Sequence, residues 1–98
     1  MLVQGPSMAP ALRHGDQLLV MFSSRRPRPG AVVVVALPDG TLAVKRLMRR
    51  DPDGQVWVEG DNPYGSTDSK KLGRLPADAV LGRVLLRVWP PGYVRTSP

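Results

Sequence analysis

Short apolar runs, each ended by glycine, proline or another turn-forming residue, recur along most of the chain. Such runs, rich in β-branched residues and separated by turn signals, predict strands. Long helices are disfavoured, since proline costs a helix interior about 3 kcal/mol and glycine about 1 kcal/mol, and the chain contains 11 prolines and 10 glycines. The predicted strands are residues 17–22, 31–37, 41–48, 55–59 and 79–89, with turns at 39–40 and 51–54. The predicted fold class is mostly β: a barrel or sandwich of short antiparallel strands with little helix.

Two adjacent cations lie within the third predicted strand. Residues 31–37, in the strand before it, are apolar at successive positions, which is typical of a strand covered on both faces. Lys45 and Arg46 then follow one another on opposite faces, each otherwise largely apolar. One of them should lie against apolar neighbours, unless it lies at an edge or its charged end reaches water, which is the commoner outcome. The functional alternative is specific to lysine, because a desolvated amine can lose its proton near pH 7 and then accept the proton of a serine hydroxyl.

The chain of 98 residues has room for one domain. We predict that this domain covers residues 3–89 and that residues 90–98 form a C-terminal tail of low order. Residues 60–76 consist largely of turn formers and are predicted to be one long loop. Loops of this length in compact domains are usually functional or disordered, so this one is a candidate for part of a site.

Cysteine is absent and histidine occurs once, at His14. Disulfide scaffolds, cysteine zinc sites and His-rich metal sites are therefore excluded, and we expect no metal and no cofactor. No apolar run approaches the roughly 18–20 residues needed to cross a bilayer. Residues 1–5 lack the basic and apolar regions of a secretory signal. We expect no transmembrane helix in this chain and a cytoplasmic location.

The net charge of +6 falls entirely in residues 1–50, where eight basic residues accompany two acidic ones. One hypothesis is a small basic β domain that binds nucleic acid through Arg25, Arg26, Arg28, Arg49 and Arg50. Proteins that stack bases usually interleave aromatic residues with the basic ones, and these clusters contain none. We therefore favour a solvated surface and expect no nucleic-acid partner.

Ser7 lies in a stiff segment that contains a glycine and two prolines, Gly-Pro-Ser-Met-Ala-Pro at 5–10, which taken alone indicates only a turn residue. Together with His14 and Asp16 it supplies the residue types of a hydrolase triad. The histidine and aspartate, however, follow closely in the same turn-rich segment, and we do not expect the three to line up. His14 is interpreted as a surface loop residue beside a turn.

Three segments taken together resemble the signal peptidase I family of Ser–Lys proteases. They are Gly-Pro-Ser-Met-Ala-Pro-Ala-Leu at 5–12 followed by Gly-Asp at 15–16, Val-Lys-Arg-Leu at 44–47, and Gly-Asp-Asn followed by Ser-x-Asp-Ser-Lys and glycine within 60–73. Segments 29–33 and 81–84 also resemble family strands. The resemblance runs in family order over residues 3–89, with two departures: Ala11 stands where threonine is usual, and Lys70 where arginine is usual.

The resemblance implies a coiled, mostly β fold and a role for each matching residue. Ser7 would be the nucleophile, Lys45 the general base, and Ser66 the partner that orients the lysine amine. Asp68 would brace the loop, pairing with Lys70. The remaining positions would be Asp61 and Asn62 as supporting residues, Met8 in the substrate pocket, and Gly5 at the position where many members carry a hydroxyl that binds the oxyanion. Without that hydroxyl, the oxyanion hole would use backbone N–H groups, chiefly that of Ser7.

The implied activity is that of a serine endopeptidase whose partner is a protein or peptide substrate. Family members usually carry a membrane helix before the nucleophile segment, whereas this chain starts four residues before Gly5. A short, arginine-rich member of this kind most resembles the nickel-type superoxide dismutase maturation proteases, which remove a leader from a precursor. The alternative is a general signal peptidase that acts on exported preproteins and has lost its anchor. An inactive relative is disfavoured because the Ser–Lys residues are present. We expect an extended substrate to add a strand at a sheet edge beside Ser7.

Overall fold

The computed structural model describes residues 1, 3, 5, 8, 11–22, 26–62 and 68–93. Within them, antiparallel strands make one sheet: β1 (Gln17–Met21), β2 (Val32–Ala36), β3 (Leu42–Arg50), β4 (Val56–Glu59), β5 (Val80–Trp89) and β6 (Gly92–Tyr93). The strand order is β1-β5-β2-β3-β4, and β6 pairs with β5. Helix is limited to α1 (Ser69–Leu72) and the 3-10 turn η1 (Ala77–Ala79). The predicted mostly β class with little helix is confirmed.

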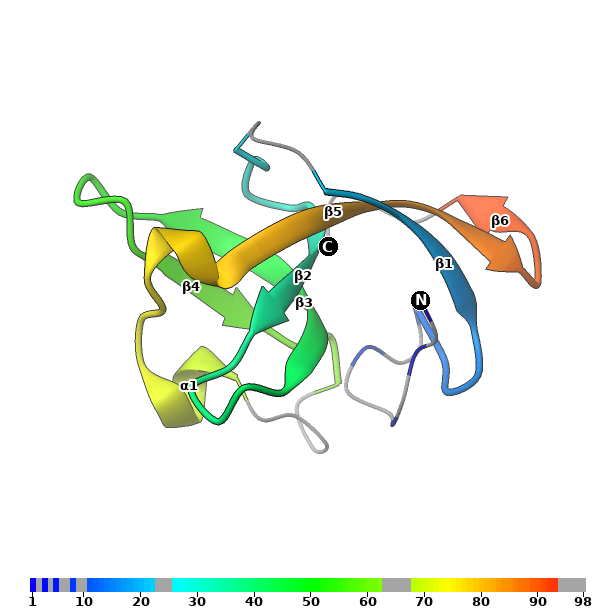
Figure 1. The fold of residues 1–98 in the computed structure, drawn as a ribbon, viewed down its shortest axis with the longest axis horizontal. Coiled ribbons are helices and arrows are strands. Elements are labelled where there is room, and N and C mark those ends of the chain that lie inside the picture. The colour runs from blue at the N-terminus through cyan, green and yellow to red at the C-terminus, as the bar shows by residue number, and fades with distance from the viewer. Residues whose placement is uncertain are drawn as a thin grey trace.

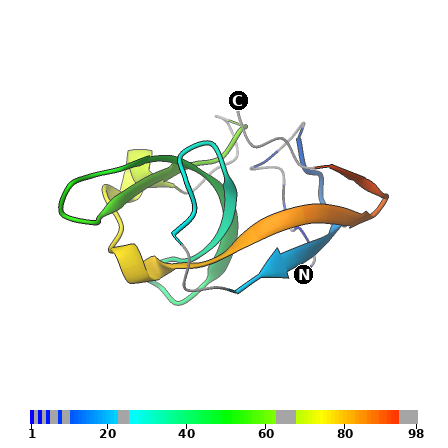
Figure 2. The same ribbon diagram turned by 90° about the horizontal axis from the view of Figure 1, so that it is seen from above.

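The longest strand, β5, connects the two halves of the molecule (Figure 1). Its first residues pair with β2, whereas residues from Arg83 to Trp89 pair with β1. Seen from above, it runs along the molecule from the side of the β3–β4 turn to β6 (Figure 2). No helix among the described residues has the length and apolar character required to cross a membrane.

Strand β2 is the centre of the core. It lies between β3 and β5, and Val32, Val33, Val34 and Val35 are each at most 1% exposed. Alternate side chains point to opposite faces of a strand. Accordingly, Val32 and Val34 belong to one apolar cluster and Val33 and Val35 to another. The prediction of a strand covered on both faces is confirmed.

The region predicted to be one long loop, residues 60–76, contains a turn of helix. The Asp68 carboxylate caps the start of α1, and Gly73 ends the helix with φ 77°, a conformation that favours glycine. Leu75 then forms an isolated bridge with Val56. A single turn is too short to show a 3.6-residue apolar period, so its sequence looked like a loop.

The beginning of the predicted tail also belongs to the sheet. Gly92 pairs with Arg87, and Tyr93 pairs with Leu86. The sequence of this stretch, Pro-Pro-Gly-Tyr, reads as a turn. The two-residue strand that follows the turn is too short for an alternating pattern, which is why it was not predicted.

Gly82 permits the close approach of β1 to β5. A Cβ atom at this position would lie 2.8 Å from the backbone oxygen of Met21 and 3.0 Å from a methyl group of Val20. Backbone cannot move aside as a flexible side chain can. The glycine in this family-like segment therefore allows two strands to pack.

We predict that Gly82→Ala lowers the free energy of unfolding by about 1–3 kcal/mol, because the added methyl overpacks the contact between β1 and β5. Urea denaturation measures the change. Gly92→Ala is the matched control, because its nearest atoms belong to the end of the Arg87 side chain, and it should cost about 1 kcal/mol or less. Equal stability of Gly82→Ala and wild type would contradict the packing role.

Candidate active site

Lys45 lies in the middle of β3 and is buried, with 4% of its surface exposed. Its register partner on β2 is the buried Val33, so the lysine shares a face with apolar side chains. Burial lowers the pKa of the Lys45 ammonium below its ordinary value, and the negative charge of Asp68 opposes part of this effect. This environment favours the neutral amine that the functional alternative requires.

The neighbouring cation, Arg46, is buried as well and forms an ion pair with Asp61. Its Nε and one terminal nitrogen donate to the two Asp61 carboxylate oxygens at 2.9 and 2.8 Å. Its other terminal nitrogen donates to the Gly30 carbonyl at 2.8 Å. A guanidinium cannot lose its proton in a protein, so burial requires bidentate pairing of this kind. Predicted as a supporting residue, Asp61 neutralises Arg46 and connects β3 to the segment after β4.

Asp68 and Ser69 fix the start of α1 against β4. The Asp68 carboxylate accepts hydrogen bonds from the backbone N–H groups of Lys70 and Gly60, at 3.0 and 3.1 Å. The hydroxyl of Ser69, a residue that is 1% exposed, accepts from the Val58 N–H at 2.9 Å. These contacts hold the Asp68 charge in the fold, where it acts on Lys45.

The structure differs from the expected pairing of Asp68 with Lys70. The hydrogen bond between these two residues involves the Lys70 backbone N–H. The Lys70 ammonium lies 3.7 Å from Glu59 instead. A helix cap uses the backbone of the second or third residue after it, so the side chain of Lys70 is free to turn to β4.

The predicted nucleophile segment is described at Gly5 and Met8, whereas Ser7 lies outside the described residues. Gly5 has φ 79°, and its N–H donates to Nδ1 of His14 at 2.9 Å. Met8 is 1% exposed and packs into the first apolar cluster, so its expected role in a substrate pocket stays a prediction. Ser66 also lies outside the described residues, and Asn62 is partly buried at the end of a described stretch.

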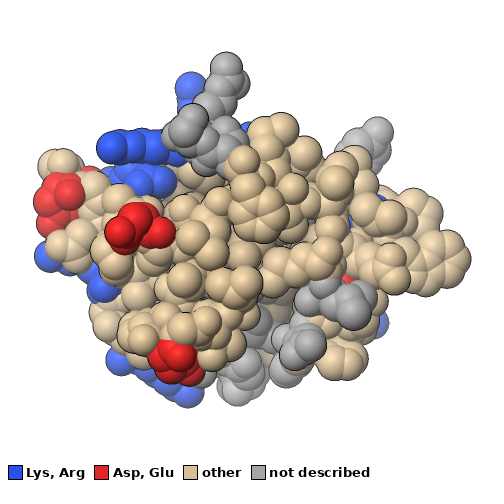
Figure 3. All heavy atoms as spheres, viewed as in Figure 1, with Lys and Arg blue, Asp and Glu red and all other residues tan. Residues whose placement is uncertain are grey.

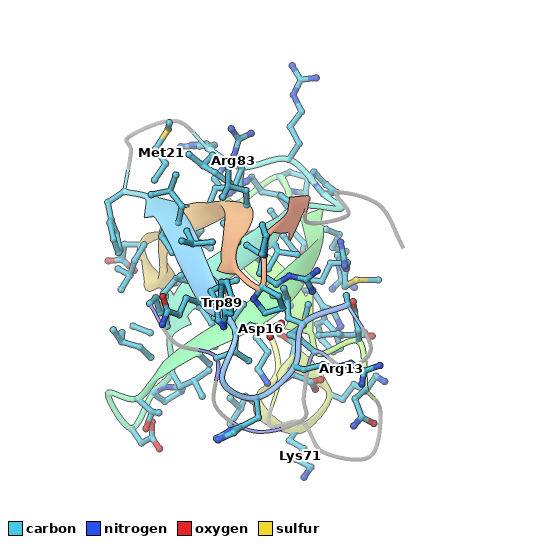
Figure 4. The ribbon with its side chains drawn as sticks, turned by 90° about the vertical axis from the view of Figure 1, so that its right-hand side faces the viewer. Arg13, Asp16, Met21, Lys71, Arg83 and Trp89 are labelled. Atoms are coloured by element: carbon cyan, nitrogen blue, oxygen red, sulfur yellow. The ribbon has the colours of Figure 1, made fainter. Side chains whose placement is uncertain are left out.

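His14 and Asp16 do not form a relay with each other. The Asp16 carboxylate accepts from the Arg13 N–H at 2.9 Å and lies 3.7 Å from the Arg87 guanidinium. It closes the loop before β1, where Figure 4 labels Arg13 and Asp16. His14 is exposed, as predicted, but its hydrogen bond to Gly5 was not expected. The sequence separation of Gly5 and His14 does not indicate this hydrogen bond, because the contact forms only when the chain between them folds back on itself.

The basic residues Arg49 and Arg50 have local partners. Arg49 lies over the Trp57 ring, 4.8 Å from its centroid, and pairs with Asp51 at 2.8 Å. Arg50 donates to the Gly54 carbonyl. On the face in Figure 3, acidic side chains lie among the basic ones along one rim. These two of the five arginines in the nucleic-acid hypothesis thus have partners within the chain, and Arg25 lies outside the described residues. The described residues hold no group of three or more acidic, histidine or cysteine side chains that could hold a metal ion.

A pattern characteristic of the Peptidase S24-like family matches residues 1–85, which is most of the chain. The chain belongs to this family. Similar proteins include mitochondrial inner membrane protease subunit 1 of Xenopus tropicalis, which is 35% identical over 113 residues covering 91% of this chain and 68% of that protein. A probable signal peptidase I-1 of Synechocystis is 49% identical over 136 residues, covering 90% of this chain and 69% of that protein. The resemblance to signal peptidase I-like proteases is thus confirmed at the level of the family.

Other relatives match this Peptidase S24-like chain over shorter stretches. Mitochondrial ATP-independent inner membrane protease subunit 1a of Arabidopsis thaliana is 55% identical over 42 residues, which cover 43% of this chain and 25% of that protein. The chain therefore spans between a quarter and about two thirds of the relatives named here. None of these three is named as a dismutase maturation protease.

We predict that Lys45→Met raises the free energy of unfolding by about 0.5–2 kcal/mol, the size common for a single stabilising substitution, because it removes a buried amine from apolar neighbours. Because the folded-state pKa is lowered, burying the lysine destabilises the fold fully at low pH. The penalty disappears as pH rises toward the pKa of an unfolded lysine, about 10.4. The gain should therefore be larger at about pH 6 than at about pH 9 when urea denaturation is compared at both.

The control is Lys71→Met, which changes an exposed lysine in α1. It should alter the stability by about 0.5 kcal/mol or less. A Lys45→Met gain that grows with pH would contradict a buried lysine of lowered pKa.

Proposed function

We propose that this chain is the catalytic domain of a serine endopeptidase of the signal peptidase type, with Ser7 as nucleophile and Lys45 as general base. The observation that carries the proposal is the burial of Lys45, which lowers the pKa of its ammonium. A lysine that is neutral near physiological pH can act as a base, which an arginine cannot. The family match and the protease relatives support the same class of activity.

The reaction is acyl transfer in two steps. The Ser7 oxygen attacks the peptide carbonyl while the Lys45 amine takes the hydroxyl proton, and the tetrahedral intermediate is stabilised by backbone N–H groups. The intermediate collapses by breaking the C–N bond, and Lys45 returns the proton to the leaving amine. Water then attacks the acyl-enzyme while Lys45 accepts one of its protons. The ester C–O bond breaks, Lys45 returns the proton to the Ser7 oxygen, and the carboxyl product leaves. Ser66, Asp68, Asp61 and Asn62 are proposed to keep the lysine in place.

The edge of β3 next to Lys45 supports binding of an extended substrate. Strand β4 pairs with β3 only from Arg46 onward, and β2 bonds the opposite side. Since backbone groups alternate along an antiparallel strand, and those of Leu47 bond toward β2, those of Leu42 and Val44 point to the side that β4 has left. Among the described residues no strand pairs with them there. A peptide added at this edge would run beside the general base.

Two classes of precursor protein are candidates for the substrate. The resemblance of the sequence favours the leader of a nickel superoxide dismutase precursor and a cytoplasmic location. The relatives carry the names of a signal peptidase and of mitochondrial inner membrane proteases, which favours preproteins of a membrane system. The dismutase precursor and the preproteins each lose an N-terminal segment, and the proposed Ser–Lys peptidase activity would apply to either substrate.

We predict that the wild-type protein cleaves members of a protein-derived peptide library, and that Ser7→Ala and Lys45→Ala each lower kcat/KM by about 10³-fold or more, as loss of a nucleophile or base does. New termini are identified by mass spectrometry. The rate should rise with pH through the lowered pKa of Lys45, because only the neutral amine is a base.

Lys71→Met serves as the matched lysine control and should retain full activity, since Lys71 is exposed in α1. A Ser7→Ala protein as active as the wild type would overturn the mechanism. A pH profile that is flat from about pH 6 to 9 would contradict a neutral lysine base.

To separate the two substrate classes, we predict that the wild type removes a defined leader from a nickel superoxide dismutase precursor. The expected result is one new N-terminus, detected by mass spectrometry, that is absent with Lys45→Ala. Cleavage of secretory preproteins alone, with the dismutase precursor left intact, would contradict this choice of substrate and leave the proposed peptidase in place.

A further inference from the structure

Met1 and Val3, which precede Ser7, are bound to the start of β1 and to the loop before it by a short antiparallel ladder. The N-terminal amine donates to the Leu18 carbonyl at 3.1 Å, and the Leu18 N–H donates back to the Met1 carbonyl at 2.8 Å. Two residues further along both strands, the Val3 N–H donates to the Asp16 carbonyl at 2.8 Å. The Val3 carbonyl accepts from the Gly15 N–H at 2.8 Å, so the pairing shifts by one residue there, and Gly5 follows beside the turn that carries His14.

At that point the ladder continues through a side chain. The chain has begun to turn, because the Asp16 N–H bonds to the Arg13 carbonyl and Gly15 has φ 90°. The Gly5 N–H instead bonds to Nδ1 of His14, at 2.9 Å. The imidazole thus supplies the acceptor that a backbone carbonyl supplies on the preceding rungs.

The conformation of Gly5 makes this last rung important. Its φ of 79° is disfavoured for other residues, although the space around a Cβ there is open within 4 Å. Glycine is the most flexible residue, so an unrestrained glycine two residues before Ser7 would let the nucleophile segment move. A hydrogen bond to Gly5 limits that movement where it begins.

We infer that His14 is a positioning residue, whose Nδ1 holds Gly5 and thereby the segment that carries Ser7. The inference rests on the proposed Ser–Lys peptidase activity. The imidazole acts through the backbone and needs no contact with Ser7 or the substrate. Because Nδ1 is the acceptor, a neutral imidazole carries its proton on Nε2.

The test compares three substitutions that differ in where they place an acceptor. In asparagine the acceptor Oδ1 is bonded to Cγ, as Nδ1 is in histidine. The glutamine oxygen is one bond further from the backbone, and alanine has no side-chain acceptor. Using the best-cleaved peptide from the library, His14→Ala and His14→Gln should lower kcat roughly ten- to hundredfold, as misplacement of a reacting group does. The KM should stay within about twofold, and His14→Asn should recover most of the lost kcat.

A second measurement follows the bond itself. In a ¹⁵N–¹H NMR spectrum of the full chain, the Gly5 amide resonance should shift in His14→Ala and His14→Gln and stay near its wild-type position in His14→Asn. A merely stabilising role would lower the melting temperature and leave kcat of the folded protein unchanged.

The outcomes separate the two proposals. Cleavage by the wild type with an unchanged kcat in His14→Ala would overturn the positioning role alone. His14→Asn as slow as His14→Ala, with the Gly5 amide retained in its wild-type position, would also overturn it. No cleavage by the wild type, or equal cleavage by Lys45→Ala, would contradict the proposed peptidase and the inference with it.

Discussion

The burial of two adjacent cations in one strand is the constraint on which the rest of this structure depends. Lys45 and Arg46 point to opposite faces of β3, and each is at most 4% exposed, so both faces of the strand must be covered. The two cations meet the cost of desolvation differently. Arg46 is paired with the Asp61 carboxylate, whereas burial lowers the pKa of Lys45. The negative charge of Asp68 opposes part of the desolvation effect on Lys45.

The chain after β4 satisfies this constraint and also closes one edge of the sheet. Asp61, which follows β4, pairs with Arg46. Further along the chain, Asp68 and Ser69 accept hydrogen bonds from the backbone of Gly60 and Val58. Along the outer edge of β4, the N–H groups of Val56, Val58 and Gly60 bond in turn to the Leu75 carbonyl, the Ser69 hydroxyl and the Asp68 carboxylate. The same stretch thus covers the edge of β4, and the start of β3 is the edge at which we propose that a substrate binds.

The family-like motifs acquire separate physical explanations in this fold. Gly82 allows close strand packing, Gly5 and Gly73 adopt positive φ, and Asp16 closes a loop by accepting a backbone N–H. Several residues of these motifs therefore have a structural role that does not require them to react. The residues proposed to react are few, and the surrounding ones fix backbone segments that come from distant parts of the sequence.

The sequence by itself determined the positions of β1 to β5, because each is long enough for burial to leave an apolar pattern between turn formers. It also placed Lys45 and Arg46 on opposite, largely apolar faces, since alternation along a strand is a local property, but it left open whether their charged ends reach water. It predicted neither α1 nor β6, which are too short to carry a pattern. Only the tertiary structure decided that both cations are buried, that Asp61 neutralises Arg46, and that His14 holds Gly5. These contacts join residues 15 and 9 positions apart, and they exist only once the strands have paired and brought the connecting segments together.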